Sequence, residues 1–200
     1  MKTRCQWVPE GDALYEKYHD EEWGVRTYDD RRLFEFLVLE SAQAGLSWAT
    51  ILKRRSGYKK AFVNFDPKKV AKFTRRDIER LSKDASIIRH RLKIESAVSN
   101  ARLFLEVQKE YGSFANYLAQ FLNPYQDKKK KRSFADVPLF TEEAEMLAKD
   151  LKKRGFKFFG PLIGYAYMQA IGMVNDHTTD CFRYNEIEKE KDLLSGPTAK

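Results

Sequence analysis

Apolar residues recur with the helical period along most of this 200-residue chain, and that pattern restricts the fold more than any other feature. From residue 28 onward they return every three or four positions, and no segment alternates apolar and polar residues as a half-buried strand would. The chain is 42% hydrophobic and 33% charged, which is typical of a globular protein. We therefore expect an all-α fold.

Local start and stop signals divide this pattern into helices. The segment LFEFLVLE is apolar on nearly all faces from Leu33 to Leu39, so its helix should be buried. The longest helical pattern runs over residues 86–111 and places His90 on a helix face. Residues 123–138 form the one clear long loop. The expected helix starts are Asp29 or Asp30, Ser47, Asp66 with Pro67, Thr74 with Asp77 as a capping box, Ser113, and Pro161.

The charge balance and the chain's N-terminus indicate its surroundings. A net charge of +8 favours a polyanionic partner, although a basic chain can also simply be more soluble. No run of eighteen apolar residues exists, and MKTRCQWVPE lacks the apolar stretch of a signal peptide. We expect a cytoplasmic protein with no membrane partner. Its two cysteines then favour a metal site or free thiols over a disulfide.

The stretch VNDHTTDC places His177 and Cys181 four positions apart, on one face if a helix continues there. Cys5 and His19 form a similar pair near the other end of the chain. Two thiolates and two imidazoles would suit a closed, structural zinc site. The spacing does not match a zinc finger, so unrelated thiols and ordinary histidines are the alternative.

Two further stretches point to chemistry. Glu40 ends a buried apolar run, where a carboxylate is costly unless it is paired or used. The ordinary alternatives are a side chain that reaches solvent and an ion pair with Lys or Arg. A carboxylate beside aromatic faces would suit a planar cation, and aromatic residues crowd the N-terminus, although most such residues are core. In RGFKFFGP, the turn from Gly155 to Gly160 could bring backbone N–H groups close to a phosphate, or could simply connect two helices.

Together these stretches resemble the 3-methyladenine DNA glycosylase I family of bacterial base-excision repair. RCQWV, YHDEEWGV, LFEFLVLESAQAGLSW, FDPKKVA, IIRHRLKI, LKKRGFKFFG and MQAIGMVNDH occur in order between residues 4 and 177. The resemblance implies a helix-hairpin-helix DNA glycosylase fold with a zinc-stapled N- and C-terminal region. Residues 1–184 would form a single glycosylase domain, or two closely packed helical lobes, and residues 185–200 a C-terminal tail.

The resemblance also implies a role for each matching residue. Glu40 would be the catalytic, adenine-reading carboxylate, and Leu46 a plug into the DNA stack. Asp176 would have a structural role, and Asp180 is assigned none. The remaining implied sets are the base pocket (Tyr15, Tyr18 and Trp48, with Trp7 nearby), the DNA-binding hairpin (Gly155, Lys157 and Gly160) and the ligands of one structural Zn²⁺ (Cys5, His19, His177 and Cys181).

The implied activity is hydrolysis of the N-glycosidic bond of 3-methyladenine in alkylated double-stranded DNA, which leaves an abasic site. No lysine is obviously set for Schiff-base chemistry, so we expect a monofunctional enzyme. We also expect it to be a monomer and to associate with the bacterial nucleoid when it acts. The alternatives are a zinc-stabilised DNA-binding protein without catalysis, a glycosylase of other lesion specificity, and a small-molecule enzyme. Glu40 and the aromatic set would be unnecessary in a protein that only binds DNA.

Overall fold

The computed structural model describes residues 2–122, 131 and 133–194, with side chains as far as Lys189, and these residues form helices and no strand. The chain divides into two compact units. Unit 1 comprises Met1–Arg26, Asn123–Leu139 and Met168–Lys200, and unit 2 comprises Thr27–Leu122 and Phe140–Tyr167. Most of the expected loop over 123–138, including most of its lysine run, lies outside the described residues. No described helix is long and apolar enough to span a bilayer.

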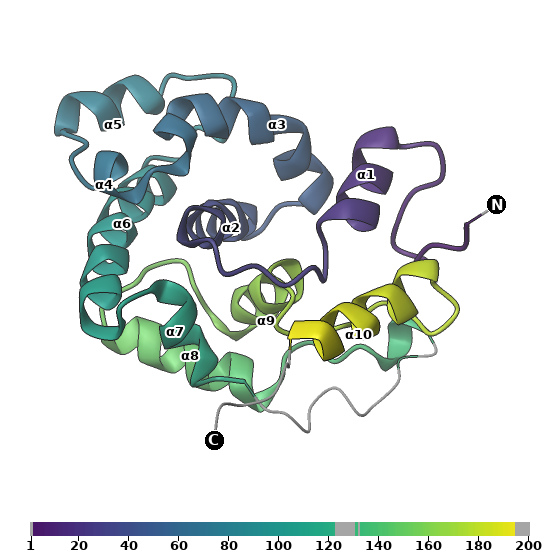
Figure 1. Ribbon diagram of the computed structural model, residues 1–200. Coiled ribbons are helices and arrows are strands. Elements are labelled where there is room, and N and C mark those ends of the chain that lie inside the picture. The colour runs from purple at the N-terminus through teal and green to yellow at the C-terminus, as the bar shows by residue number, and fades with distance from the viewer. Residues whose placement is uncertain (1, 123–130, 132, 195–200) are drawn as a thin grey trace. The chain divides into compact units, whose positions relative to one another are not determined.

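Figure 1 shows the helices in their order along the chain. Unit 1 holds α1 (Ala13–Glu21), η3 (Phe134–Asp136), α10 (Phe182–Leu194) and the last turn of α9 (Pro161–Ala170). Unit 2 holds the rest of α9 and the elements α2 (Asp30–Gln43), α3 (Trp48–Ala61), η1 (Val63–Phe65), α4 (Pro67–Val70), α5 (Arg75–Leu81), α6 (Arg91–Tyr111), α7 (Phe114–Ala119) and α8 (Glu142–Lys153).

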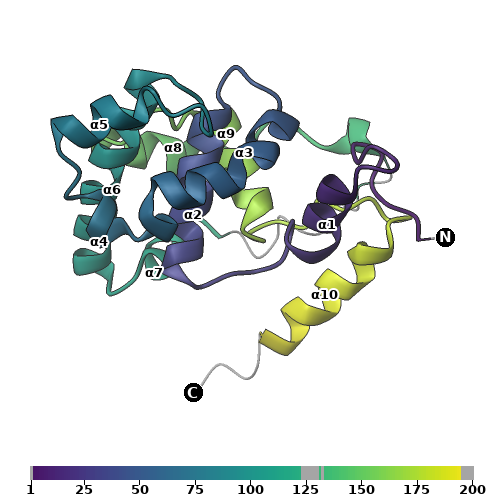
Figure 2. The same cartoon turned by 90° about the horizontal axis from the view of Figure 1, so that it is seen from above.

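Helix α2 is the centre of unit 2. It contacts α3, α6, α7 and η1, and Figure 1 looks along its axis with α3, α6 and α7 around it. Figure 2 shows α3 lying beside it. Aromatic rings extend this core, since Phe34 packs edge-on against Phe104 at 5.3 Å and Phe104 stacks on Phe114 at 4.1 Å. Every residue from Phe36 to Ala42 is buried, which confirms the prediction made from LFEFLVLE.

The predicted helix starts are confirmed, because their side chains accept backbone hydrogen bonds in the first turn. Asp29, Ser47, Asp66, Thr74 and Ser113 each cap a helix, and Thr74 forms the complete capping box.

Two expectations about helices differ from the structure. The longest helix begins at Arg91, so His90 is its N-cap, and His90 Nδ1 accepts the backbone N–H of Lys93 at 3.3 Å instead of lying on a helix face. Helix α1 lies before residue 28 and was not anticipated, because only two of its nine residues, Tyr18 and His19, are buried. A helix with so narrow a buried face has little apolar periodicity to detect.

A glycine permits the closest backbone approach in unit 1. Gly172 has φ +72°, and a Cβ built on it would lie 2.4 Å from the Arg26 backbone nitrogen and from the Val25 carbonyl carbon. No side chain can be placed there without moving the backbone of the segment that follows α1. Gly11 has a similar φ of +79° but nothing within 4 Å of such a Cβ, so it isolates the cost of the left-handed conformation alone.

We predict that Gly172→Ala destabilises the protein far more than Gly11→Ala. The free energy of unfolding of Gly11→Ala should fall by about 1 kcal/mol, the cost of the left-handed conformation alone. The backbone clash should make the fall for Gly172→Ala about 3 kcal/mol or more. Urea unfolding of both variants measures the difference. Equal losses would show that the close approach at Gly172 does not exist in solution.

Candidate metal centre and buried carboxyl

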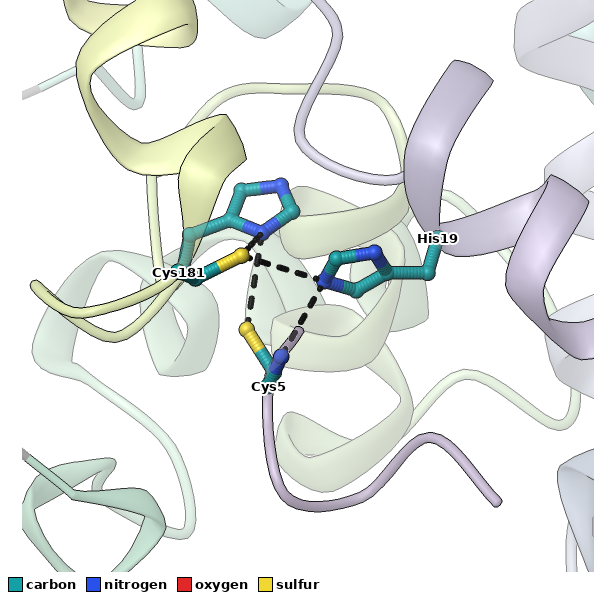
Figure 3. Close-up of side chains that lie close together, drawn as sticks. Cys5, His19 and Cys181 are labelled. Atoms are coloured by element: carbon teal, nitrogen blue, oxygen red, sulfur yellow. Dashed lines mark hydrogen bonds between the residues drawn. The ribbon is translucent and has the colours of Figure 1, made fainter. Parts of the chain in front are cut away.

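Four potential metal ligands converge in unit 1. Their ligand atoms all lie within 4.8 Å of one another, and all four residues are buried. Cys5 comes from the N-terminal segment and His19 from α1, while His177 and Cys181 lie in the segment just before α10. Figure 3 shows the side chains of Cys5, His19 and Cys181 pointing toward one another. His177 and Cys181 do not share a helix as the spacing suggested, because residues 175–181 are non-helical and α10 begins at Phe182.

Hydrogen bonds on the outer side of each imidazole fix the nitrogen that faces inward. His19 Nδ1 lies 2.7 Å from Asp20 Oδ1, and His177 Nε2 lies 3.0 Å from the carbonyl oxygen of Trp23. Both oxygens can only accept, so these nitrogens carry the protons. The lone pairs of His19 Nε2 and His177 Nδ1 therefore point toward the two sulfurs. This is the usual orientation of metal-binding histidines.

The spacing of the donor atoms fits a tetrahedral ion. Cys5 Sγ lies 3.5 Å from His177 Nδ1, and Cys181 Sγ lies 3.5 Å from both His19 Nε2 and His177 Nδ1. Tetrahedral bonds of about 2.3 Å to sulfur and about 2.0 Å to nitrogen would place S and N about 3.5 Å apart. Three of the six distances between donor atoms therefore already match those around one tetrahedral ion, and all six are within 4.8 Å.

A charged pair supports the cluster from outside. Arg4 donates to both oxygens of Asp20, at 2.8–3.1 Å, and Asp20 in turn accepts from His19. No sequence pattern predicted Arg4 or Asp20. The signal was nevertheless present, because a carboxylate directly after a candidate histidine ligand is a common partner of its second nitrogen.

Mutual contact shifts the pKa values of the Cys5 and Cys181 thiols in opposite directions. The Cys5 thiol donates a hydrogen bond to Cys181 and so lowers the pKa of Cys181. The same bond, together with burial, raises the pKa of Cys5. One thiolate is thus already favoured in this pocket, and a divalent cation would supply the charge needed to ionise the second.

Trp7, Tyr15 and Tyr18 also belong to unit 1. The Trp7 ring packs edge-on against Tyr15 at 5.7 Å, His19 at 5.3 Å and Trp23 at 4.8 Å. It therefore forms part of the wall of the Cys–His cluster. Tyr18 is buried, and Tyr15 is half-buried.

Glu40 lies in unit 2, in the last turn of α2, and is only 3% exposed. Its Oε2 has no hydrogen-bond partner within the described part of the chain, and no Lys or Arg described there lies within ion-pair distance. Neither of the ordinary alternatives, a side chain that reaches solvent or an ion pair, therefore applies. Burial raises the pKa of Glu40 to about 8. A buried carboxyl without a partner costs free energy, which is typical of a residue used for binding or catalysis.

A lysine fixes the backbone just after Glu40. Lys93 Nζ donates to the carbonyl oxygens of Ala42 at 2.8 Å and Ala44 at 2.5 Å. These bonds satisfy carbonyl groups at the end of α2 and hold the loop that follows it. That loop carries Leu46, which is 40% exposed, and it leads to Trp48 at the start of α3. Lys93 was not singled out from the sequence, because its partners are backbone atoms about fifty residues away.

The predicted hairpin turn also lies in unit 2, between α8 and α9. Gly155 has φ +98°, Phe156 and Phe159 are buried, and Lys157 and Gly160 are exposed. The fully buried Asn100 holds the turn at two points. Its Oδ1 accepts the Lys157 N–H and its Nδ2 donates to the Lys157 carbonyl, both at 3.0 Å. The backbone of the turn is thus fixed while its lysine side chain faces solvent.

The two aspartates near the cluster differ in environment. Asp176 is buried, accepts from Gln169 Nε2 at 2.7 Å and lies 3.7 Å from Lys131 Nζ. Asp180 is exposed. These contacts fit a structural role for Asp176.

The raised pKa of Glu40 predicts how stability depends on pH. An unfolded glutamate titrates near pH 4.3, so the folded chain binds an additional proton between about pH 4.3 and 8. The contribution of Glu40 to stability is therefore present below this window and is lost as the pH rises through it. Relative to Glu40→Gln, which stays neutral, the wild type should lose about 3 kcal/mol between pH 5.5 and 8. Urea unfolding of both proteins at both pH values measures this loss. If the stability of the wild type and that of Glu40→Gln changed equally with pH, Glu40 would be paired or solvated.

Comparison with known proteins places these features in a family. The profile of the methyladenine glycosylase family matches residues 7–184. The chain is 46% identical over 181 residues to DNA-3-methyladenine glycosylase 1 of Escherichia coli (strain K12), covering 90% of this chain and 96% of that protein.

Solved structures agree with the sequence match. A crystal structure of 3-methyladenine DNA glycosylase I is 47% identical, with a TM-score of 0.86, and the match covers 90% of this chain and 98% of that one. A variant of 3-methyladenine DNA glycosylase I in complex with 3-methyladenine is 40% identical, with a TM-score of 0.82, over 86% of this chain and 92% of that one. The chain therefore belongs to the methyladenine glycosylase family.

Proposed function

We propose that this protein removes 3-methyladenine from alkylated DNA by hydrolysing its N-glycosidic bond, which leaves an abasic site. The observation that carries the proposal is the buried, unpaired carboxyl of Glu40 in a chain whose relatives, over nearly their whole length, are 3-methyladenine DNA glycosylases. We further propose that it acts on double-stranded DNA as a monomer.

The reaction requires little general-acid catalysis. N3-methylated adenine in DNA carries a positive charge, so its glycosidic bond is already weak and the base leaves as a neutral molecule. The protein must extrude the nucleotide, reject normal adenine and stabilise the cationic sugar that develops. Water then attacks C1′, the bond from C1′ to the base breaks, and the base takes the bonding electron pair. The attacking water loses a proton to solvent.

Glu40 can supply selectivity for the charged base. With nothing opposite it, burial favours the protonated carboxyl. A cationic base would reverse that preference, because an opposite charge nearby lowers the pKa of a carboxyl and stabilises its ionised form. Normal adenine is neutral and offers no such compensation. Glu40 would therefore bind the alkylated base and the cationic transition state more tightly than an undamaged base.

The remaining predicted residues are assigned by the family resemblance. Tyr15, Tyr18 and Trp48 would stack on and enclose the base, with Trp7 supporting them. The exposed Leu46 would enter the base stack from its loop, which Lys93 holds in place. In a helix-hairpin-helix arrangement, the turn with Gly155, Lys157 and Gly160 would bind phosphate, and its backbone is held by Asn100.

Glu40→Gln should lose most of the excision activity without losing stability. The substitution keeps the shape of the side chain but removes its charge, so release of 3-methyladenine from methylated duplex DNA should fall about 100-fold or more. The exposed Glu106 provides the matched control, and Glu106→Gln should retain wild-type release.

The product identifies the reaction class. An intact strand with an abasic site supports hydrolysis alone, and a β-eliminated strand would indicate a lyase. No release by the folded wild type would support a DNA-binding protein without catalysis.

We also propose that Cys5, His19, His177 and Cys181 bind one structural Zn²⁺. Two cysteine sulfurs, two correctly oriented imidazoles and sulfur–nitrogen distances of 3.5 Å support this assignment. A site closed by four protein ligands leaves no position for water or substrate, so the bound ion would stabilise the fold and take no part in excision. It would join the N-terminal segment, α1 and the segment before α10.

Removing a ligand should therefore cost stability more than chemistry. We predict that His177→Ala loses one equivalent of zinc and several kcal/mol of stability, whereas His90→Ala keeps its zinc and loses about 1 kcal/mol, the usual cost of an N-cap. Metal analysis and thermal unfolding of both variants test this. A His177→Ala protein that lacks zinc but is as stable as the wild type would contradict the structural role.

A further inference from the structure

A basic hollow opens in the surface of unit 2, and nothing proposed above uses it. It has a volume of about 570 Å³ and lies where the N-terminus of α2, the end of α3, η1 and α4 meet. Four cationic side chains line it, together with one carboxylate: Arg31, Lys59, Lys60, Lys69 and Asp66. A volume of this size is typical of ligand-binding sites.

The protein neutralises only part of the positive charge of the basic hollow. Asp66 Oδ1 caps α4 by accepting the N–H groups of Lys68 and Lys69, and Asp66 Oδ2 lies 3.9 Å from Arg31. No acidic group within the described ranges forms an ion pair with Lys59, Lys60 or Lys69. Three ammonium groups around one concave surface repel one another unless an anion lies among them.

The backbone beside the hollow is strained. Val63, Asn64 and Phe65 have φ values of +50°, +56° and +52°, so three consecutive residues other than glycine adopt the left-handed conformation. Each costs about 1–2 kcal/mol, and the β-branched Val63 is especially unfavourable. The buried Phe65 ring anchors the turn, while Val63 is exposed and lines the hollow together with Asn64. Strain of this kind clusters at binding sites.

We propose that the basic hollow binds a phosphoryl group, either a DNA phosphodiester or the phosphate of a small ligand. Lysine ammonium groups are compact charges that suit phosphate oxygens, and the Asn64 amide and the Ser56 hydroxyl add neutral hydrogen-bond donors to the lining. The site is separate from the base-reading carboxyl. Arg31 and Glu40 are nine residues apart in α2, which places them about 13 Å apart along the helix axis.

Binding of a DNA phosphodiester in the hollow rests on the proposed function, whereas binding of a small phosphate ligand does not. Two probes are therefore needed. Inorganic pyrophosphate binding is measured by calorimetry at low salt, and undamaged duplex DNA binding by fluorescence anisotropy over a series of salt concentrations. The test variant is Lys59→Gln/Lys60→Gln. The control, Lys83→Gln/Lys109→Gln, removes the same charge from exposed lysines that do not line the hollow. Thermal unfolding verifies that both variants are folded.

The hollow variant should bind at least one probe about tenfold more weakly than the control does. A loss confined to pyrophosphate identifies a small phosphate ligand. A loss of duplex affinity, with the salt slope reduced by about 0.9 for each phosphate contact removed, identifies the DNA backbone. Equal effects of the two variants on both probes would overturn the proposal, because the charge would then act only through the overall field. Release of 3-methyladenine by the wild type, measured in parallel, tests the proposed function separately.

Discussion

The burial of helix α2 on nearly every face is the constraint on which unit 2 depends. A helix with so little polar surface must be surrounded, and α3, α6, α7 and η1 lie around it. The same burial removes Glu40 from water, so the packing that stabilises the unit also leaves a carboxyl in an unfavourable environment. Lys93 closes the helix by binding the carbonyl groups of Ala42 and Ala44, which leaves Glu40 itself unpaired.

This arrangement links stability to selectivity. A carboxyl that the fold leaves without a partner gains most from a ligand that brings a positive charge, and an alkylated adenine brings one. The Cys–His cluster of unit 1 has the opposite character. The donor atoms there face one another, and each imidazole donates a hydrogen bond outward, His19 to Asp20 and His177 to the Trp23 carbonyl, so the cluster is suited to a permanent ion. In the roles proposed here, the cluster would keep its ion permanently, whereas Glu40 would discriminate between charged and neutral bases.

The sequence predicted those features that depend on neighbouring residues or on a family pattern. The buried helix and its cap at Asp29 follow from local periodicity and capping, and the convergence of the four ligands follows from the resemblance. Features that depend on distant backbone atoms could not be predicted, as with Lys93 at the end of α2 and Asn100 at the hairpin turn. The left-handed turn at Val63 contradicts local propensity, so only the surrounding fold explains it.

The most direct test of this account is the pKa of Glu40 in the free protein, measured by NMR titration of its side-chain carboxyl carbon. Comparison with Glu40→Gln assigns the signal. A midpoint near 8 would show that the carboxyl is buried without a partner and is available to a cationic base. A midpoint near the ordinary glutamate value of about 4.3 would mean that water or a partner already stabilises its charge. The basis for selecting the alkylated base would then have to lie elsewhere in the protein.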